Sequence, residues 1–386
     1  MNFSAHPFWL AGFRPFFTLA CIAGLALPPL WVLVYLGALP APASPVGAVQ
    51  WHAHEMFFGF GWAVLGGFLL TATKNWVGIR GYHGAPLAVL FAAWLFERIG
   101  MAFGAGWPPG LFAVSSNLFL AAIVAMLLWT LVSHRKDDSY RDNYFFLLIL
   151  PAFLLAKHLM LGVEHFQAGV AMATGLFRVA FLVMLERTLT QFMKGIFQVE
   201  ILRHATLDKA IKLLAVALVG AGLMPPPAAA WLSLLLALLL AGRFFFWKPQ
   251  LALRRIDLGI MYLGYAAIVL QLLAEFLGQV APPAWVGAVS THVFGLGVMG
   301  LIIPAMLIRI AKGHTGRKVV FEAIDKAVLW IMVAAFVLRV VAPQFLPQHY
   351  ALWLALAACG WLAGFGILAW RLIPFLLQAR IDGKEH

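Results

Sequence analysis

The sequence predicts an all-α, polytopic transmembrane helical bundle of about 12 spans, and three observations carry that prediction. Hydrophobic residues make up 63% of the chain and charged residues only 11%, a balance typical of membrane proteins. Apolar runs long enough to cross a bilayer recur from end to end. Lys and Arg gather in alternate loops between those runs. We therefore expect residues 1–386 to form a single integral membrane domain.

The apolar runs justify the individual elements. A helix needs roughly 20 apolar residues to cross a bilayer core, and inside lipid it satisfies all of its own backbone groups. In chain order, the expected spans are 15–38, 52–73, 85–103, 110–132, 143–162, 168–190, 207–224, 228–247, 256–279, 284–308, 323–342 and 350–375.

The loops between these spans alternate in charge. Lys and Arg are absent from the loops at 39–50, 104–109, 163–167, 225–227, 280–283 and 343–349. Every other loop is basic, from Lys74 and Arg80 to Arg380 and Lys384. Because basic loops stay in the cytoplasm, we expect both termini there. The net charge of +12 then reflects topology, with the lipid bilayer as partner. Nucleic-acid binding would need a soluble basic domain, which the sequence lacks.

Cysteine usage and the connecting segments add further limits. Cys21 and Cys359 lie in separate spans and no Cys-x-x-Cys-His occurs, which excludes a disulfide framework and covalently attached haem. The N-terminus lacks the charged start of a secretory signal, so we expect the first span to be retained. The long connection 191–206 mixes apolar and basic residues and is interpreted as an interfacial helix.

Ionisable side chains within the spans concentrate at one depth, in the outer half of the expected bundle. Such residues are costly in a bilayer and usually mark function. They are His52, His54, Glu55, Glu97, Arg98, Lys157, His158, Glu275, His292 and Arg339, with Glu164 and His165 just beyond. Arg178 lies near mid-membrane and requires a partner.

The segment Trp51–Met56 holds two histidines and a glutamate at the start of a long apolar run. Because neutral imidazole is the commonest metal ligand, the segment suggests a metal or haem site. Two residues on a helix are about 200° apart, so its histidines should serve two different roles. His292 shares a helix face with Gly295 and Met299, where glycine leaves room for a flat macrocycle or a close helix.

These positions give a ranked set of candidate ligands. The leading haem or copper ligands are His52, His54 and His292. His158 and His165 follow, seven residues apart on one helical stripe and about 10 Å along it. Arg98 is a candidate partner of haem propionates, or of Glu97. An isolated intramembrane histidine is more often a packing residue than a ligand, so the clustering at one depth is what favours ligation.

A second polar segment lies on the opposite, cytoplasmic side. Gly313–Lys318 ends a span with the residues Gly-His-Thr-Gly-Arg-Lys. A tight turn there presents His314 and Arg317, which can hold an anion or a cofactor carboxylate. A basic helix C-cap is the commoner explanation of such a pattern.

Several blocks of the sequence resemble the NnrS family of nitric-oxide-response membrane proteins. The matching blocks are Gly12–Phe17, Trp51–Met56, Gly59–Phe60, Gly67–Ala72, Asn75–Trp76, His292–Gly300, Arg309 and Gly313–Arg317. The resemblance covers essentially the whole chain. It implies a bacterial inner-membrane protein of about twelve helices with non-covalent haem b and copper. It also implies a role in denitrifying and nitric-oxide-exposed bacteria, in the relief of nitrosative stress. Whether such a protein is a nitric-oxide-converting oxidoreductase stays open.

The chain departs from the family pattern at two places. Thr190-Gln191-Phe192-Met193 stands where the family tends to have an Ile-Pro-Phe-Phe-like turn after the arginine matched by Arg187. Tyr262 stands where it tends to have a histidine before Leu-Gly-Tyr. A ligand or regulatory feature at these places is therefore in question.

Two other function classes fit about twelve spans. A proton-coupled secondary transporter would use a His/Glu site, and Pro151 and Pro304 are possible helix-breaking signals of that class. A haem–copper oxidase or nitric oxide reductase subunit would need adjacent paired histidines, which the sequence lacks.

Overall fold

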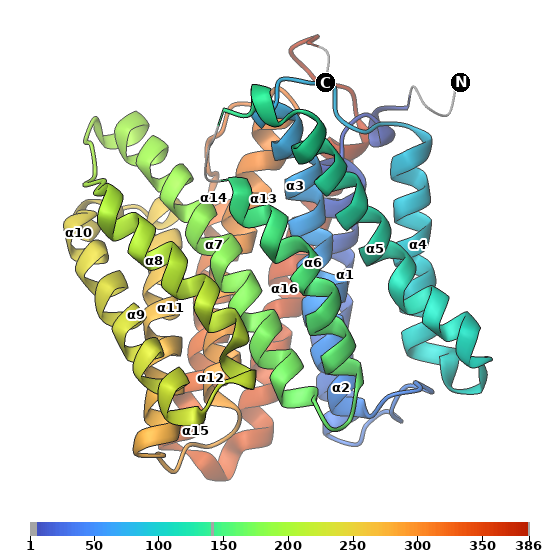
Figure 1. Ribbon diagram of the computed structural model, residues 1–386, viewed down its shortest axis with the longest axis vertical. Helices are drawn as coiled ribbons and strands as arrows, with labels where there is room; N and C mark the ends of the chain where they lie inside the picture. The colour runs from blue at the N-terminus through green and yellow to red at the C-terminus, as the bar shows by residue number, and fades with distance from the viewer. Residues whose placement is uncertain (1–5, 140–142, 385–386) are drawn as a thin grey trace. The chain divides into compact units, whose positions relative to one another are not determined.

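The computed structural model describes residues 6–139 and 143–384, and the regular elements in that part of the chain are helical (Figure 1). Eight spans are single helices: α1 (Phe13–Tyr35), α4 (Ala85–Phe103), α5 (Pro109–Ser133), α6 (Tyr144–Leu161), α7 (Phe166–Phe197), α9 (Pro226–Phe246), α11 (Ile256–Val280) and α16 (Tyr350–Leu377).

Four spans are composite, and three of these contain a π-helical segment. The first joins α2 (Ala48–His54), π-helical η3 (Glu55–Gly61) and α3 (Trp62–Trp76). The others are α8 (Ala205–Ala217) with η7 (Leu218–Leu223); α12 (Val289–His292), π-helical η8 (Val293–Met299) and α13 (Gly300–His314); and α14 (Ala323–Phe336), π-helical η9 (Val337–Val341) and α15 (Ala342–Phe345). The short α10 (Pro249–Ala252) precedes α11.

The prediction of an all-α polytopic bundle is confirmed. Ten helical runs of the described chain are long and apolar enough to cross a membrane. The two remaining expected spans coincide with shorter helical runs, α6 and α8 with η7. The ends of α7 and α13 lie later in the chain than expected.

Two expectations about helix boundaries are wrong. Residues 191–197 do not start an interfacial helix but continue α7, and residues 198–204 are not helical. The hydroxyl of Thr190 donates to the Glu186 carbonyl at 2.7 Å, and no proline interrupts the ladder. Pro151 and Pro304 lie inside the continuous helices α6 and α13. Transmembrane helices tolerate such prolines because neighbouring groups satisfy the freed carbonyls.

Hydroxyl side chains within the helices bond to their own backbone. Thr71 donates to the Gly67 carbonyl and Thr73 to the Leu69 carbonyl, both at 2.8 Å. These i to i−4 bonds satisfy polar groups that would otherwise be costly in an apolar setting. The Thr71 hydroxyl also accepts a hydrogen bond from the Phe13 N–H of α1 at 3.0 Å.

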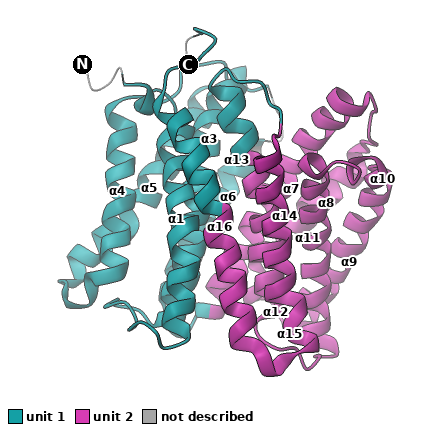
Figure 2. Cartoon of the chain, turned by 180° about the vertical axis from the view of Figure 1, so that it is seen from behind, with its two compact units in different colours: residues 1–166, 307–320, 365–386 teal, residues 167–306, 321–364 magenta. Residues whose placement is uncertain are grey.

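The chain divides into two compact units (Figure 2). Unit 1 comprises residues 1–166, 307–320 and 365–386, and unit 2 comprises residues 167–306 and 321–364. The last part of α13 belongs to unit 1 while its first part belongs to unit 2, and α16 is divided similarly. The expectation of one integral domain over residues 1–386 stays a prediction.

Small residues let the helices of each unit approach closely. In unit 1, a Cβ on Gly67 of α3 would stand 2.8 Å from the Phe16 side chain of α1. In unit 2, a Cβ on Gly297 of η8 would stand 2.9 Å from the Ala267 side chain of α11. Each contact lets a span that carries ionisable side chains pack closely against its neighbour within the unit.

Candidate functional site

Unit 1 gathers five ionisable side chains from three spans into one buried group, which we call the unit 1 ionic cluster. It consists of His54 and Glu55 at the junction of α2 and η3, Glu97 and Arg98 on α4, and Lys157 on α6. His54 and Glu97 are fully buried, and Lys157 is 1% exposed. The sequence-based clustering of these groups at one depth is thus matched by contact in space.

Glu97 lies at the centre of this cluster. Its Oε1 accepts a hydrogen bond from Lys157 and lies 3.3 Å from His54 Nε2. Its Oε2 lies 3.2 Å from Arg98 Nη2. The second carboxylate, Glu55, lies 3.2 Å from His54 Nδ1 and 3.3 Å from Arg98 Nε. Two carboxylates therefore balance two permanent cations, with an imidazole between the carboxylates.

Several buried polar atoms in the cluster have no hydrogen bond of good geometry, although most of them lie near an opposite charge. They are His54 Nε2, Glu97 Oε2 and the three side-chain nitrogens of Arg98. Lys157 differs, because it also donates to the Ser116 carbonyl. Buried polar atoms are nearly always hydrogen-bonded. Atoms that lack a hydrogen bond therefore mark the cluster as a candidate for binding a ligand or moving a proton.

The π-helical segment η3 shapes the approach to this cluster. π turns occur frequently at functional sites, because the extra residue alters which side chains face inward. The Trp94 indole N–H donates to the Gly59 carbonyl at 3.1 Å. A Cβ on Gly59 would collide with Arg98 Nη1 and stand 2.9 Å from Glu55 Oε2. Glycine at this position therefore admits the guanidinium to the carboxylates.

His52 lies apart from the cluster. Its ring stacks on Trp31 of α1, with centroids 4.4 Å apart and planes at 8°. The side chain is half-buried. As the two-residue spacing predicts, His52 and His54 meet different neighbours.

His292 belongs to unit 2, where it ends α12 just before η8. Its Nδ1 lies 2.7 Å from the Ala288 carbonyl, so this nitrogen carries the proton and donates. Nε2 is then an acceptor, and Arg339 Nη2 of η9 lies 3.2 Å from it. A Cβ on Gly295 would meet no heavy atom within 4 Å, so space is open one turn beyond this ring.

Arg178 of α7 has the partner that the sequence required. It donates to both carboxylate oxygens of Glu275 on α11, at 3.0 and 3.2 Å. Gln271 and Ser233 also donate to this carboxylate, at 2.5 and 3.3 Å. The pair is structural in kind, a buried cation neutralised within unit 2.

The secondary histidines do not join the unit 1 ionic cluster. His158 and His165 are both exposed, although Lys157 next in sequence is buried. The reason is helical geometry, because one residue turns a side chain by about 100°. His314 and Arg317 lie at the end of unit 1 that carries the chain termini, where Arg380 contacts the His314 carbonyl.

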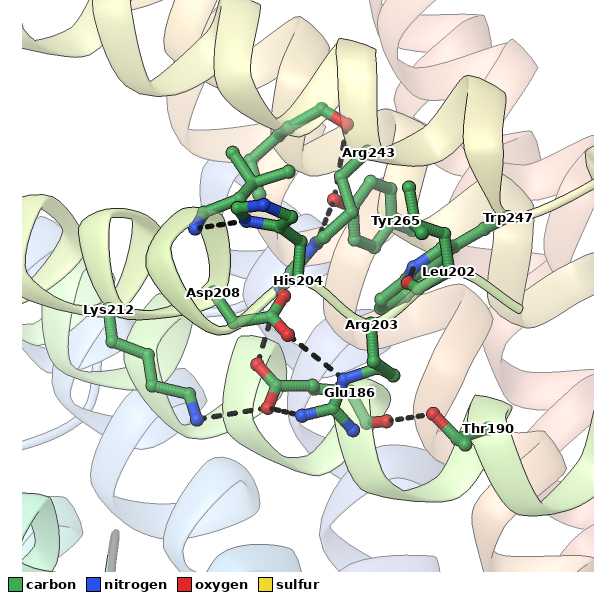
Figure 3. Close-up of polar contacts among 12 residues, drawn as sticks. Glu186, Thr190, Leu202, Arg203, His204, Asp208, Lys212, Arg243, Trp247 and Tyr265 are labelled. Atoms are coloured by element: carbon green, nitrogen blue, oxygen red, sulfur yellow. Dashed lines mark hydrogen bonds and ion pairs between the residues drawn. The ribbon is translucent and has the colours of Figure 1, made fainter. Parts of the chain in front are cut away.

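Unit 2 contains a second buried network, the unit 2 ionic cluster, which sequence reasoning missed (Figure 3). Glu186 of α7 accepts from Arg203 and Arg243, and Lys212 Nζ lies 2.9 Å away. Asp208 of α8 accepts from Arg203 at 3.0 Å and Arg243 at 3.3 Å. The positive-inside pattern counted Arg203 as a loop residue, which hid its pairing with the two acids.

Aromatic side chains enclose Arg243 of that cluster. Its guanidinium lies 4.5 Å from the Trp247 ring and donates to the Tyr265 hydroxyl at 3.0 Å. Tyr262 is fully buried and donates to the Trp247 carbonyl at 2.8 Å. Tyr262 therefore holds the backbone of this enclosure.

The described side chains support haem and copper, the two cofactors that the sequence suggested, to different degrees. Within residues 6–139 and 143–384, no group of three or more His, Cys, Asp and Glu side chains is arranged to hold a metal ion. The candidate metal ligands His52, His54 and His292 belong to no such group, and copper binding by them stays a prediction. Haem iron needs only one axial imidazole. His292 meets the requirement of a fixed tautomer, because metal-bound histidines usually donate their other N–H to a carbonyl.

Comparison with known protein families gives one match. The family described as NnrS protein matches residues 7–380, nearly the whole chain. No curated protein sequence matches it significantly. The matched region includes both units, the unit 1 ionic cluster and His292. The chain therefore belongs to the NnrS family.

Proposed function

We propose that this NnrS-family protein is a bacterial inner-membrane protein that binds or processes nitric oxide and relieves nitrosative stress, using a non-covalent haem b held in unit 2. The single observation that supports the haem is His292, whose Nδ1 is fixed by the Ala288 carbonyl while Nε2 is left as an acceptor. When bound, haem iron supplies a coordination position for nitric oxide, and the surrounding polarity decides whether the gas is held or converted.

The residues around His292 suit that role. Arg339 is half-buried, and no carboxylate within the described chain pairs with it. A cation in an apolar setting needs an anionic partner, which a haem propionate would provide. The open space beside Gly295 leaves room for a flat ring.

Absorption spectroscopy of the purified protein with metal analysis tests this proposal. We expect a Soret band in the wild type, its loss in His292→Ala, and a weakened band in Gly295→Leu because leucine fills the open space. His349→Ala and Gly278→Leu are matched controls, since His349 is exposed and a Cβ on Gly278 also meets open space. A metal-free, colourless wild type, or full haem in His292→Ala, would overturn it.

The predicted topology belongs to the same proposal. We expect both termini in the cytoplasm, the loops 39–50, 104–109 and 280–283 in the periplasm, and the segments 133–142 and 311–322 in the cytoplasm. Cysteine substitutions in these loops, treated with a membrane-impermeant thiol reagent, test it. Labelling of Thr315→Cys from outside intact cells would contradict this topology.

A proton-coupled secondary transporter is the second candidate, and the unit 1 ionic cluster favours it. His54 Nε2 lies 3.3 Å from Glu97 Oε1, so a small movement would form the hydrogen bond along which the two groups could exchange a proton. Reconstituted protein that moves protons with a solute, and loses this in Glu97→Gln while binding no haem, would establish the transporter in place of the first proposal.

A further inference from the structure

Three helices of unit 1 end close together, at the end that also carries the chain termini. They are α3, α13 and α16, which end at Trp76, His314 and Leu377. The C-terminus of a helix carries partial negative charge and attracts cations. Several basic side chains gather here, so those that cap helix ends must first be separated from those that do not.

Three of the basic side chains bond to backbone carbonyls. Arg14 Nη1 donates to the carbonyls of Leu376 and Gln378 at 2.7 and 2.6 Å. Arg380 Nη1 donates to the His314 carbonyl at 3.3 Å. Lys312 Nζ donates in the same way to the Val320 carbonyl at 2.6 Å. Capping and chain docking account for these cations.

Arg380 also pairs with the carboxylate of Asp382. Its Nε and Nη2 bond to the two oxygens of Asp382 at 2.9 and 2.6 Å. This hydrogen bonding lowers the pKa of Asp382 to about 2. The carboxylate is therefore charged at neutral pH and already engaged by Arg380.

Lys74, His314 and Arg317 remain without an acidic partner among the described residues. Arg317 lies 4.0 Å over the Phe375 ring, and its Nη2 donates to Gln378 Oε1 at 2.9 Å. Its Nη1 is buried and has no hydrogen-bond partner. Burial lowers the pKa of this guanidinium. A lowered pKa means that burial disfavours the charged guanidinium, and a bound anion would offset that cost.

Two of the three remaining groups, His314 and Arg317, lie on one turn, and Lys74 is within electrostatic range of His314. Lys74 and Arg380 both act electrostatically on His314, and Arg380 acts on Lys74. The His314 ring packs against Phe13 with centroids 5.3 Å apart. Lys74 is half-buried, with its stem against Gly81. A bound anion would reduce the repulsion among these cations.

The turn that carries two of these groups is rigid. The Thr315 hydroxyl donates to the Ala311 carbonyl at 2.6 Å, and the Ile381 N–H donates to the Thr315 carbonyl at 3.1 Å. Gly316 has a φ of +81°, which only glycine adopts without strain. The turn therefore presents His314 and Arg317 in a fixed arrangement, as a preformed site requires.

We propose that Lys74, His314 and Arg317 form a binding site for a phosphate group. The planar guanidinium of Arg317 and the point charge of Lys74 are the side-chain types that proteins use for phosphate. The charge pattern of the loops predicts that this end faces the cytoplasm, at the depth of lipid headgroups. The phosphate belongs either to an anionic phospholipid or to a soluble phosphate compound.

Thermal unfolding of the purified full-length protein distinguishes these sources. One arm adds inorganic phosphate to protein in neutral detergent, against chloride at equal ionic strength. The other compares nanodiscs of phosphatidylcholine with nanodiscs that also contain phosphatidylglycerol. We expect a saturable rise in the midpoint in at least one arm. Lys74→Gln and Arg317→Gln should weaken the apparent affinity at least about tenfold, the value of one charge-assisted hydrogen bond.

Lys318→Gln is the matched control, because it removes an exposed cation next to Arg317 in sequence. We expect it to keep the wild-type response. A rise with phosphate alone assigns a soluble ligand, and a rise with phosphatidylglycerol alone assigns a lipid. No specific rise in the wild type overturns the proposal even if the variants fail to fold. An equal loss in Lys318→Gln also overturns it.

Discussion

The histidine that precedes a π-helical segment has different neighbours in unit 1 and in unit 2. Both spans contain Phe-Gly-x-Gly within the π-helical segment, at Phe58–Gly61 and Phe294–Gly297. In unit 1, His54 lies inside an ionic cluster with a carboxylate near each ring nitrogen. In unit 2, His292 bonds to a carbonyl and faces Arg339. The same local sequence thus has carboxylates beside its histidine in one unit, and a carbonyl and an arginine beside it in the other.

The difference arises from what the neighbouring helices supply. In unit 1, α4 and α6 bring Glu97, Arg98 and Lys157 to the histidine. In unit 2, the acid on α11, Glu275, is engaged by Arg178, and Glu186 and Asp208 belong to a separate cluster. A histidine next to a π-helical segment is therefore not by itself a ligand. Its role depends on whether acidic side chains lie in contact with it.

Removing the central carboxylate of unit 1 should have the largest effect. Glu97→Gln leaves Lys157 and Arg98 buried with a single carboxylate, and breaking such a pair costs about 3–5 kcal/mol. We expect a correspondingly lower free energy of unfolding, measured by denaturant titration in detergent. Glu164→Gln, at an exposed site, should leave stability unchanged. If both variants behave alike, the cluster does not stabilise unit 1.

A second substitution sharpens that result. Lys157→Met added to Glu97→Gln removes the charge that the first change strands. We expect the double variant to be more stable than Glu97→Gln alone, because a stranded buried charge is the main cost. A further loss of stability in the double variant would show that packing, rather than charge pairing, dominates.

The unit 2 ionic cluster should respond less strongly. Glu186→Gln weakens contacts to three cations, but Asp208 still pairs with two of them and Arg203 is 40% exposed. We expect a loss on the order of 2 kcal/mol in the same titration. Glu200→Gln, in an exposed pair with Lys194, is the control and should show no measurable change. A loss as large as that of Glu97→Gln would remove the distinction between the clusters.

The matching glycines test the comparison directly. Gly59→Ala forces a methyl group against Arg98 and Glu55, and such overpacking costs about 1–3 kcal/mol. Gly295→Ala meets open space and should be neutral or gain up to about 1 kcal/mol from helix propensity. Thermal unfolding of both variants measures the contrast. Equal destabilisation by both changes would contradict the difference between the two π-helical segments.

The smallest effect is expected at His52. Because this ring stacks on Trp31, His52→Ala should cost about 0.5–1.5 kcal/mol, while His52→Phe retains the stacking and should restore most of it. The Soret absorbance should not change in either variant. Loss of haem in both would move the ligand from His292 to His52.

The sequence was informative wherever the pattern depends on composition or spacing. Apolar runs gave twelve helical segments because a bilayer leaves the backbone no other way to bond. The sequence predicted a similar depth for Glu97, Arg98 and Lys157 and left their partners open. The two-residue spacing predicted that His52 and His54 would differ. The exposed positions of His158 and His165 were missed, because spacing along one helix does not say which stripe faces inward.

What the sequence alone determined was the class of fold, the family and the candidate residues. Only the tertiary structure decided their partners: Glu97 for His54, Arg339 for His292, Glu275 for Arg178, and two acids for Arg243. The physical reason is that hydropathy and charge act locally along the chain, whereas a buried charge is stabilised by whichever opposite charge a different helix brings within a few ångströms.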